Sequence, residues 1–172
     1  MTQTELNSLL THVIGEARAL SIPVSRCISP EVQVNTRART RFGCCRRSGL
    51  RFHIEVSAAL LEGEPFALRQ VLAHEILHTC PGCSDHGSRW KGYAQQMNAA
   101  FGYAIRRADR FEDLGLTDRR PVRWLIVCTQ CGHSSGRMKR SPLTEHPERY
   151  RCRCGGRLEV RPAEEFPQKA DP

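Results

Sequence analysis

The sequence predicts an α+β fold followed by a small metal-stabilised module, on three observations. Apolar residues recur at helical spacing over residues 4–20, 64–77 and 88–110. Residues 32–41 and 50–56 instead alternate between apolar and polar side chains, as half-buried strands do. Two close pairs of cysteines follow near the C-terminus. We therefore expect helices packed on a small antiparallel sheet, with a separate cysteine-bearing segment after them.

The first third of the chain carries the first helix and the predicted sheet. Thr2 and Glu5 form a capping-box pair at the start of the helix over residues 4–20. Gly43 is expected to turn the chain between the strands at 32–41 and 50–56, and His53 falls on the polar face of the second strand. An exposed strand of such a sheet can hold an extended peptide substrate. We expect Cys27 to lie in the core.

Two later helices complete the predicted core. Pro65 suits the first position of a helix, and that helix is anchored by an apolar set: Phe66, Leu68, Val71, Leu72, Ile76 and Leu77. The last helix is expected over residues 88–110, where a second set recurs at three- and four-residue spacing: Trp90, Ala94, Met97, Phe101, Ala104 and Ala108. We interpret both sets as packing residues, and we expect residues 111–121 to form a linker.

Length and composition limit the class of protein. The chain of 172 residues fits one domain with a small appendix. It contains no run of about 18 apolar residues, so no membrane-spanning helix is predicted. Its start lacks the basic and apolar regions of a secretory signal, so we expect a cytoplasmic protein, located at the nucleoid if the source is bacterial. Nine cysteines in such a chain indicate metal binding rather than a disulfide framework.

The segment His74-Glu75-Ile76-Leu77-His78 indicates a catalytic zinc site. Residues four apart share a helix face, so His74 and His78 can ligate one metal ion together. Glu75 lies one step round the helix, close enough to reach a metal-bound water without ligating the metal. Catalytic zinc takes three protein ligands and leaves its fourth position to water. A chance match on a surface helix is the alternative interpretation.

His86 is the best third ligand, because Pro81 and Gly82 break the helix and let the chain turn back. Asp85 is its competitor. The interval of eight residues between His78 and His86 does not fit the metzincin spacing, and residues 88–110 contain no Glu that could serve instead. The predicted chemistry is metal-assisted peptide hydrolysis, with Glu75 as the general base that later protonates the leaving amine.

A second, structural zinc site is predicted near the C-terminus, with these ligands: Cys128, Cys131, Cys152 and Cys154. Only Arg153 separates the last two cysteines, which makes a tight chelate, and His133 or His146 could replace one sulfur. A redox pair or free thiols are the alternative. The remaining paired cysteines, Cys44, Cys45, Cys80 and Cys83, leave three interpretations open: a further zinc site, a disulfide or buried thiols.

Positive charge is concentrated in the cysteine-bearing segment. Residues 119–161 hold 11 Lys and Arg residues but three Glu, whereas residues 1–115 hold 14 against 11 acidic residues. Such a basic module indicates a polyanion partner. Basic side chains contact phosphates and aromatic faces stack on bases, which suits single-stranded DNA. The predicted DNA-binding residues are Arg123, Trp124, Arg137, Lys139, Arg140, Arg149, Tyr150, Arg151 and Arg153. The alternative is that Trp124 and Tyr150 fill the module's small core.

Together these motifs resemble the SprT-like metalloprotease family. The matching segments are Gly43-Cys44, His74-Glu75-Ile76-Leu77-His78, Thr79-Cys80-Pro81-Gly82-Cys83 and His86-Gly87-Ser88-Arg89-Trp90, with the C-terminal cysteines beyond them. The resemblance implies a compact zincin-like metalloprotease domain, which we place at residues 1–115, and a C-terminal zinc ribbon, at 122–161. We expect residues 162–172 to form a disordered tail.

The resemblance also implies an activity and its partners. It implies one catalytic and one structural Zn²⁺, cleavage of DNA-bound or DNA-crosslinked proteins, and DNA as the activator. Two alternatives remain from the sequence: a non-catalytic, zinc-stabilised DNA-binding protein, and a metalloprotease unrelated to DNA. The intact Glu75 argues against the first alternative, since a structural zinc site needs no carboxylate there.

Overall fold

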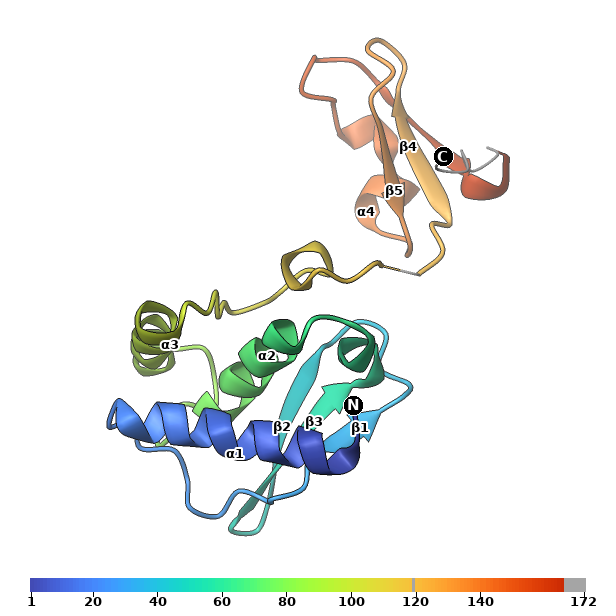
Figure 1. Cartoon of the computed structure of the whole chain (residues 1–172). Helices are drawn as coiled ribbons and strands as arrows, with labels where there is room; N and C mark the ends of the chain where they lie inside the picture. Colours follow the sequence, from blue (N-terminus) through green and yellow to red (C-terminus); the bar gives the residue numbers. More distant parts are fainter. Residues whose placement is uncertain (119, 166–172) are drawn as a thin grey trace. The chain divides into compact units, whose positions relative to one another are not determined.

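The computed structural model describes residues 1–118 and 120–165, so most of the predicted tail, residues 166–172, lies outside the described residues. The chain divides into two compact units, Met1–Asp118 and Arg119–Pro172 (Figure 1). The first contains three α-helices and a three-stranded sheet, and the second contains another three-stranded sheet with one short helix, among the described residues. The α+β class predicted from the sequence is therefore correct.

Helix α1, Gln3–Ala19, begins with the predicted capping box. The Glu5 backbone N–H donates to the Thr2 hydroxyl at 3.3 Å, and the Thr2 N–H donates to the Glu5 carboxylate at 2.6 Å. These two bonds satisfy donors that the first turn of a helix otherwise leaves free. The buried face of α1 consists of Leu6, Leu10, Val13 and Ala17.

The sheet of the first unit is mixed, where the sequence predicted an antiparallel one. Strands β1 (Gln33–Asn35), β2 (Gly43–Ser48) and β3 (Arg51–Ser57) lie in the order β1-β3-β2. Strand β2 is antiparallel to β3, whereas β1 is parallel to it. The predicted strand at 32–41 is shorter because the Asn35 side chain accepts hydrogen bonds from the backbone N–H groups of Arg37 and Ala38. This turn ends the strand.

The turn of the β2–β3 hairpin is at Gly49, not at Gly43 as predicted. Gly49 has a φ of 59°, the left-handed conformation that favours glycine. Gly43 instead starts β2, a strand that was not predicted because the stretch from Gly43 to Ser48 shows no apolar alternation. Figure 1 shows β2 and β3 as the long hairpin of this unit.

Helix α2, Pro65–Leu77, is the central element of the first unit. It packs against α1, α3 (Ser88–Phe101), β2 and β3, and buried residues occur on all of its sides, as in a helix enclosed by others. Pro65 is at its first turn, as predicted. Phe66 is an exception to the predicted core, since it is 45% exposed and lies beside the Tyr103 ring at 5.3 Å.

Helix α3 ends at Phe101, nine residues before the predicted end. Gly102 follows it with a φ of 73° and caps the helix in the left-handed conformation. The chain then turns back, and the backbone N–H of Ala104 donates to the Gln70 side chain at 2.9 Å. Part of the predicted linker also belongs to this unit, because Leu114 is buried in its core. Cys27, predicted to be buried, is exposed.

The second unit contains β4 (Trp124–Cys128), β5 (Ser134–Arg137) and β6 (Leu158–Pro162), in the antiparallel order β5-β4-β6. A short helix, α4 (Pro142–Glu145), lies between β5 and β6 in the sequence. Ile126 and Cys128 of β4 are buried. None of the helices in the described part of the chain is long and apolar enough to cross a membrane.

The central position of α2 predicts that its buried residues are more sensitive to substitution than its exposed ones. Leu72, which is 0% exposed, leaves a cavity when replaced by Ala, so Leu72→Ala is expected to lower the free energy of unfolding by about 2–5 kcal/mol. Phe66→Ala on the same helix is expected to cost under about 1 kcal/mol. Urea unfolding of both variants measures the difference, and equal losses would contradict the burial of α2.

Candidate metal centres

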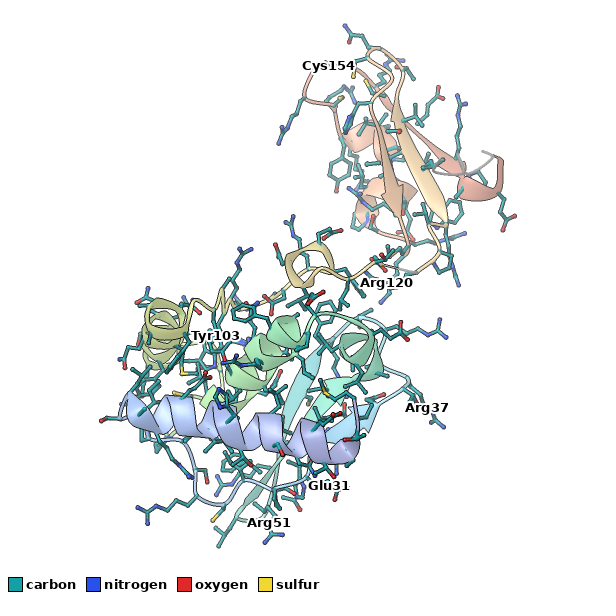
Figure 2. The ribbon with its side chains drawn as sticks, in the orientation of Figure 1. Glu31, Arg37, Arg51, Tyr103, Arg120 and Cys154 are labelled. Atoms are coloured by element: carbon teal, nitrogen blue, oxygen red, sulfur yellow. The ribbon has the colours of Figure 1, made fainter. Side chains whose placement is uncertain are left out.

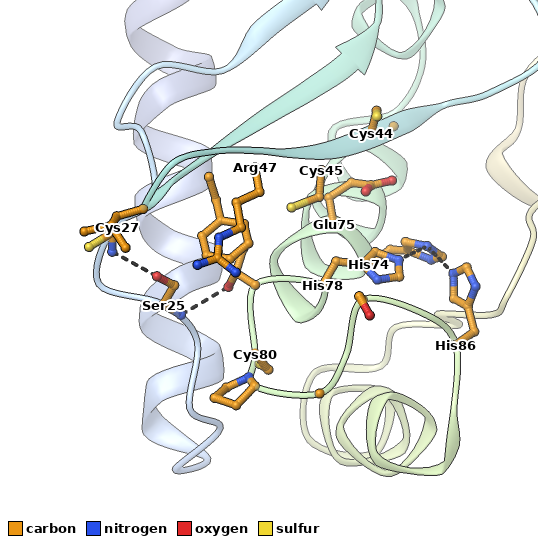
Figure 3. A pocket seen from close by; sticks show the side chains of 17 residues that line it. Ser25, Cys27, Cys44, Cys45, Arg47, His74, Glu75, His78, Cys80 and His86 are labelled. Carbon is orange, nitrogen blue, oxygen red and sulfur yellow. Dashed lines mark hydrogen bonds between the residues drawn. The ribbon is translucent and has the colours of Figure 1, made fainter.

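Three imidazoles of the first unit converge on one point. His74 and His78 lie one turn apart on α2 and its C-terminal cap, and the loop after α2 brings His86 to them (Figure 3). Their Nε2 atoms are 3.0 Å apart for His74 and His86, and 3.3 Å apart for His74 and His78. Tetrahedral zinc with Zn–N bonds of about 2.0–2.1 Å needs nitrogen atoms about 3.3 Å apart. The donor set therefore fits a metal ion.

The surroundings of the three rings keep them in this arrangement. The Nδ1 atom of His78 is 2.7 Å from the carbonyl oxygen of Cys83, a bond in which Nδ1 is the donor and Nε2 is left free to ligate. The buried Trp90 ring contacts all three imidazoles, with centroid distances of 4.8 Å to His74, 5.6 Å to His78 and 4.5 Å to His86. Trp90 thus closes one side of the group.

Burial and mutual proximity lower the pKa of two of these histidines, His74 and His86. Burial, followed by the charges of His78 and His86, lowers the pKa of His74 from 6.5 to about 3. Burial, with His78 next, also lowers the pKa of His86. A neutral imidazole is the form that ligates a metal. Of the two predicted candidates for the third position, the structure places His86 and not Asp85 in the group.

Glu75 lies beside the three imidazoles and outside their ligand group. It is 7% exposed, and this burial raises the pKa of its carboxyl to about 8. A hydrogen bond from the Cys45 backbone has the opposite, smaller effect on the pKa. Gly43 of β2 approaches it so closely that a Cβ there would be 2.5 Å from Glu75 Oε1. A glycine is therefore required where β2 crosses α2. A cation held by the histidines would favour the charged carboxylate and oppose the effect of burial.

A groove of about 930 Å³ opens in front of this site. One wall is β2 with the start of β3, the other is the loop from Thr79 to His86, and His74, Glu75 and His78 lie between them. A smaller cavity of about 200 Å³ is also lined by His74 and Glu75, and its other lining residues include Arg41, Arg107 and Asp109. The β2 residues of the groove were not predicted from the sequence, although Gly43-Cys44 was noted as a motif.

The four C-terminal cysteines form a second donor group. Their sulfur atoms all lie within 4.8 Å of one another, and Cys128–Cys154 and Cys131–Cys152 are 3.5 and 3.7 Å apart. Zinc with Zn–S bonds of about 2.3 Å needs sulfur atoms about 3.8 Å apart, whereas a disulfide needs about 2.05 Å. The single residue between Cys152 and Cys154 does not keep either sulfur out of the group. His133 and His146 are not part of it.

Local backbone geometry favours the thiolate form of Cys128, one member of this group. Hydrogen bonds from the backbone of Cys131 and then of Gln130 lower the pKa of Cys128 to about 6. Gly156 allows the chain to pass close by, since a Cβ there would lie 2.6 Å from the Cys128 sulfur. Both features fit a bound metal, which requires deprotonated sulfur.

The other paired cysteines do not assemble into a third group. Cys80 and Cys83 are buried and Cys44 and Cys45 are partly buried, and all four are free thiols. Across residues 1–118 and 120–165, clusters of three or more potential metal ligands occur only at the two sites above. Of the three interpretations left open by the sequence, the structure favours free, partly or fully buried thiols.

The predicted DNA-binding residues lie on the surface of the second unit, many of whose side chains project outwards (Figure 2). The basic residues of the set are all exposed: Arg123, Arg137, Lys139, Arg140, Arg149, Arg151 and Arg153. Tyr150 is 40% exposed, so its ring is accessible. Trp124 is partly buried, and the Arg140 guanidinium lies over its ring at 5.4 Å. One face of Trp124 is thus already occupied.

The first unit is an α+β unit whose three converging imidazoles, with a buried glutamate beside them, form a donor set suited to a metal ion. The model of the SprT-like family matches residues 23–109, and the chain belongs to this family. The match covers the sheet, α2 and α3 with both histidine segments, and it ends before the cysteine group. No curated protein gives a significant match to the chain.

The two donor groups predict a metal content. We expect two zinc ions per chain by native mass spectrometry, one lost in His86→Ala and the other in Cys152→Ser, because each variant removes one ligand of one group. The double variant Cys80→Ser/Cys83→Ser should keep both ions. A count of three in the parent chain, or of one in the double variant, would contradict the assignment.

The lowered pKa of His74 predicts a pH dependence for the metal-free chain. Its folded pKa is about 3 and its ordinary value is 6.5, so the unfolded chain binds the extra proton between these values. Stability is therefore present above pH 6.5 and falls as the pH drops towards 3, by at most about 1.4 kcal/mol per pH unit. Denaturant unfolding of the parent and of His74→Gln at pH 7 and pH 5 measures this, and the variant should lose less on acidification.

Proposed function

We propose that the chain is a zinc-dependent endopeptidase that cleaves proteins bound or crosslinked to DNA, with DNA as its activator. The observation that carries the peptidase proposal is the convergence of three Nε2 atoms next to a buried glutamate, all facing a groove. The zincin-like identity of the first unit and the zinc-ribbon identity of the second are part of this proposal. Membership of the SprT-like family supports them, since that family is associated with metalloproteases.

Each residue of the site has a separate task. His74, His78 and His86 hold the metal, and His78 is oriented by its bond to the Cys83 carbonyl. When bound there, zinc supplies a Lewis acid that polarises a peptide carbonyl and activates water. Glu75 accepts the proton of the attacking water on its carboxylate and donates it to the leaving amine. Trp90 excludes water from the far side of the imidazoles.

Strand β2 gives the substrate a place to bind. It pairs with β3 along one edge, and the described residues contain no strand on its other edge, which borders the groove. A peptide in extended conformation can hydrogen-bond to such an edge as an added strand. This binding would carry a peptide bond past Gly43 and Cys45 to the histidines, because both of these β2 residues approach Glu75.

The DNA part of the proposal rests on the second unit. Its exposed arginines provide the positive charge that phosphates require, and the accessible Tyr150 ring provides a stacking surface for a base. The cysteine group would hold these residues in place when zinc is bound. A protease recruited in this way would act on proteins already located on DNA.

The general-base assignment predicts the effect of one isosteric change. Glu75→Gln keeps the shape of the side chain but cannot accept a proton. The rate of cleavage should therefore fall by about 10²- to 10⁴-fold, which is the usual contribution of general acid–base catalysis. Both zinc ions should be retained. Cleavage of a basic DNA-binding protein is followed on gels with and without single-stranded DNA.

The same assay separates the alternatives. Cleavage that DNA stimulates supports the proposal, and cleavage indifferent to DNA would make the chain a metalloprotease unrelated to it. DNA binding without cleavage would leave a non-catalytic DNA-binding protein. Undiminished cleavage by Glu75→Gln would show that another group acts as the base.

DNA binding itself should depend strongly on salt. Binding of the full chain to labelled single-stranded DNA, measured by anisotropy, should weaken as salt rises. The triple variant Arg149→Ala/Arg151→Ala/Arg153→Ala should lower the slope of log K against log salt by about 2, at about 0.7 for each phosphate that is no longer neutralised. A triple variant with the same loss of charge in the first unit, Arg37→Ala/Arg39→Ala/Arg51→Ala, is the comparison. Salt-independent affinity would exclude this mode of binding.

A further inference from the structure

The end of the groove that lies away from the metal ligands combines a positive charge with apolar side chains. Its lining there consists of Ser25, Cys27, Arg47, Leu50 and Phe52. Leu50 is 79% exposed at the turn of the β2–β3 hairpin, and Phe52 is partly buried. Arg47 supplies the positive charge of this end, and Glu75, at the other end, is the sole carboxylate among the described residues that line the groove.

Arg47 is held in place but not neutralised. Its Nε atom donates to the carbonyl oxygen of Gly49 at 2.9 Å, and its guanidinium lies over the Phe52 ring at 5.6 Å from the centroid. Arg47 and Phe52 are cross-strand partners in the β2–β3 pair, so both side chains are on one face of the sheet. No ion pair to Arg47 occurs within the described residues. Its terminal N–H groups remain available as an oriented fork.

The alternation of β2 points Arg47 towards the same groove as the catalytic residues. Gly43, Cys45 and Arg47 are two residues apart and share a face of the strand. Figure 3 shows Cys45 and Arg47 on the side of the strand that faces Glu75 and the loop carrying Cys80. Arg47 is four residues from Gly43, which corresponds to about 13 Å of extended chain. A peptide paired with β2 would therefore place one side chain next to Arg47.

From this geometry we infer a specificity subsite: Arg47, stacked on Phe52, binds a carboxylate side chain of the substrate about four positions from the scissile bond. The inference rests on the proposed peptidase function. In antiparallel pairing with β2, that position is on the N-terminal side of the bond, because β2 runs from Gly43, at the catalytic residues, to Ser48. The aliphatic part of the acidic side chain would contact Leu50 and Phe52, and its carboxylate would accept hydrogen bonds from the guanidinium.

A peptide series tests this subsite. Peptides of one sequence carry Glu, Gln or Lys four positions before the cleaved bond, and kcat/KM is measured for the zinc-loaded full chain. The Glu peptide should be preferred over the Lys peptide about fivefold, as expected for a partly exposed charge pair. Arg47→Ala should abolish this preference and Arg47→Glu should invert it. Arg51→Glu, at the outer end of the same hairpin (Figure 2) but on the opposite face, should leave it unchanged.

Binding of the same peptides separates failure of the subsite from failure of the peptidase function. Their Kd values are measured by anisotropy on zinc-loaded Glu75→Gln, with and without Arg47→Glu. If the parent cleaves no peptide, the proposed function fails, but a Glu preference in Kd that Arg47→Glu inverts still supports the subsite. Equal cleavage and equal binding of the three peptides would overturn it. A loss of DNA affinity in Arg47→Glu with no change in peptide preference would also overturn it, since Arg47 would then contact phosphate.

Discussion

The convergence of three imidazole nitrogens on one point is the constraint on which the first unit depends. Nitrogen atoms about 3 Å apart on three rings either share a proton in a hydrogen bond or ligate one common cation. The fold holds them in place because α2 is enclosed on all sides and Trp90 of α3 packs against every ring. A bound metal would add to the free energy of unfolding, since the unfolded chain holds no preformed site.

The same enclosure of α2 places Glu75 under a second constraint. Strand β2 crosses α2 at Gly43, and no larger residue fits between the strand and the carboxylate. The close contact buries Glu75 and burial raises its pKa, whereas a metal ion held by the nearby histidines would favour the charged form. Proton affinity in such a group is set by two opposing effects, which is the arrangement that general acid–base chemistry requires. Strand β2 thus supports the carboxylate with one residue and lines the groove with the next ones.

The two units differ in what stabilises them. The first has a continuous core of apolar side chains from α1, the sheet, α2 and α3. In the second, the buried apolar side chains of the described residues are Ile126 and Cys128, too few for a core of its own. A metal bound by its four cysteines would therefore supply much of the stabilisation of this unit. The exposed arginines add charge but no core.

Sequence alone determined the features that depend on short-range spacing: the capping box of α1, the start of α2 at Pro65, the shared face of His74 and His78, and the paired cysteines. Each follows from the geometry of one turn or one helix. The tertiary structure decided the rest, because it depends on partners far along the chain. Asn35 ends β1 early, β2 forms without apolar alternation because β3 pairs with it, and Gly102 stops α3. Only the folded loop brings His86 to α2. Only the pairing of β2 with β3 directs Arg47 into the groove, because strand register is set by long-range hydrogen bonds.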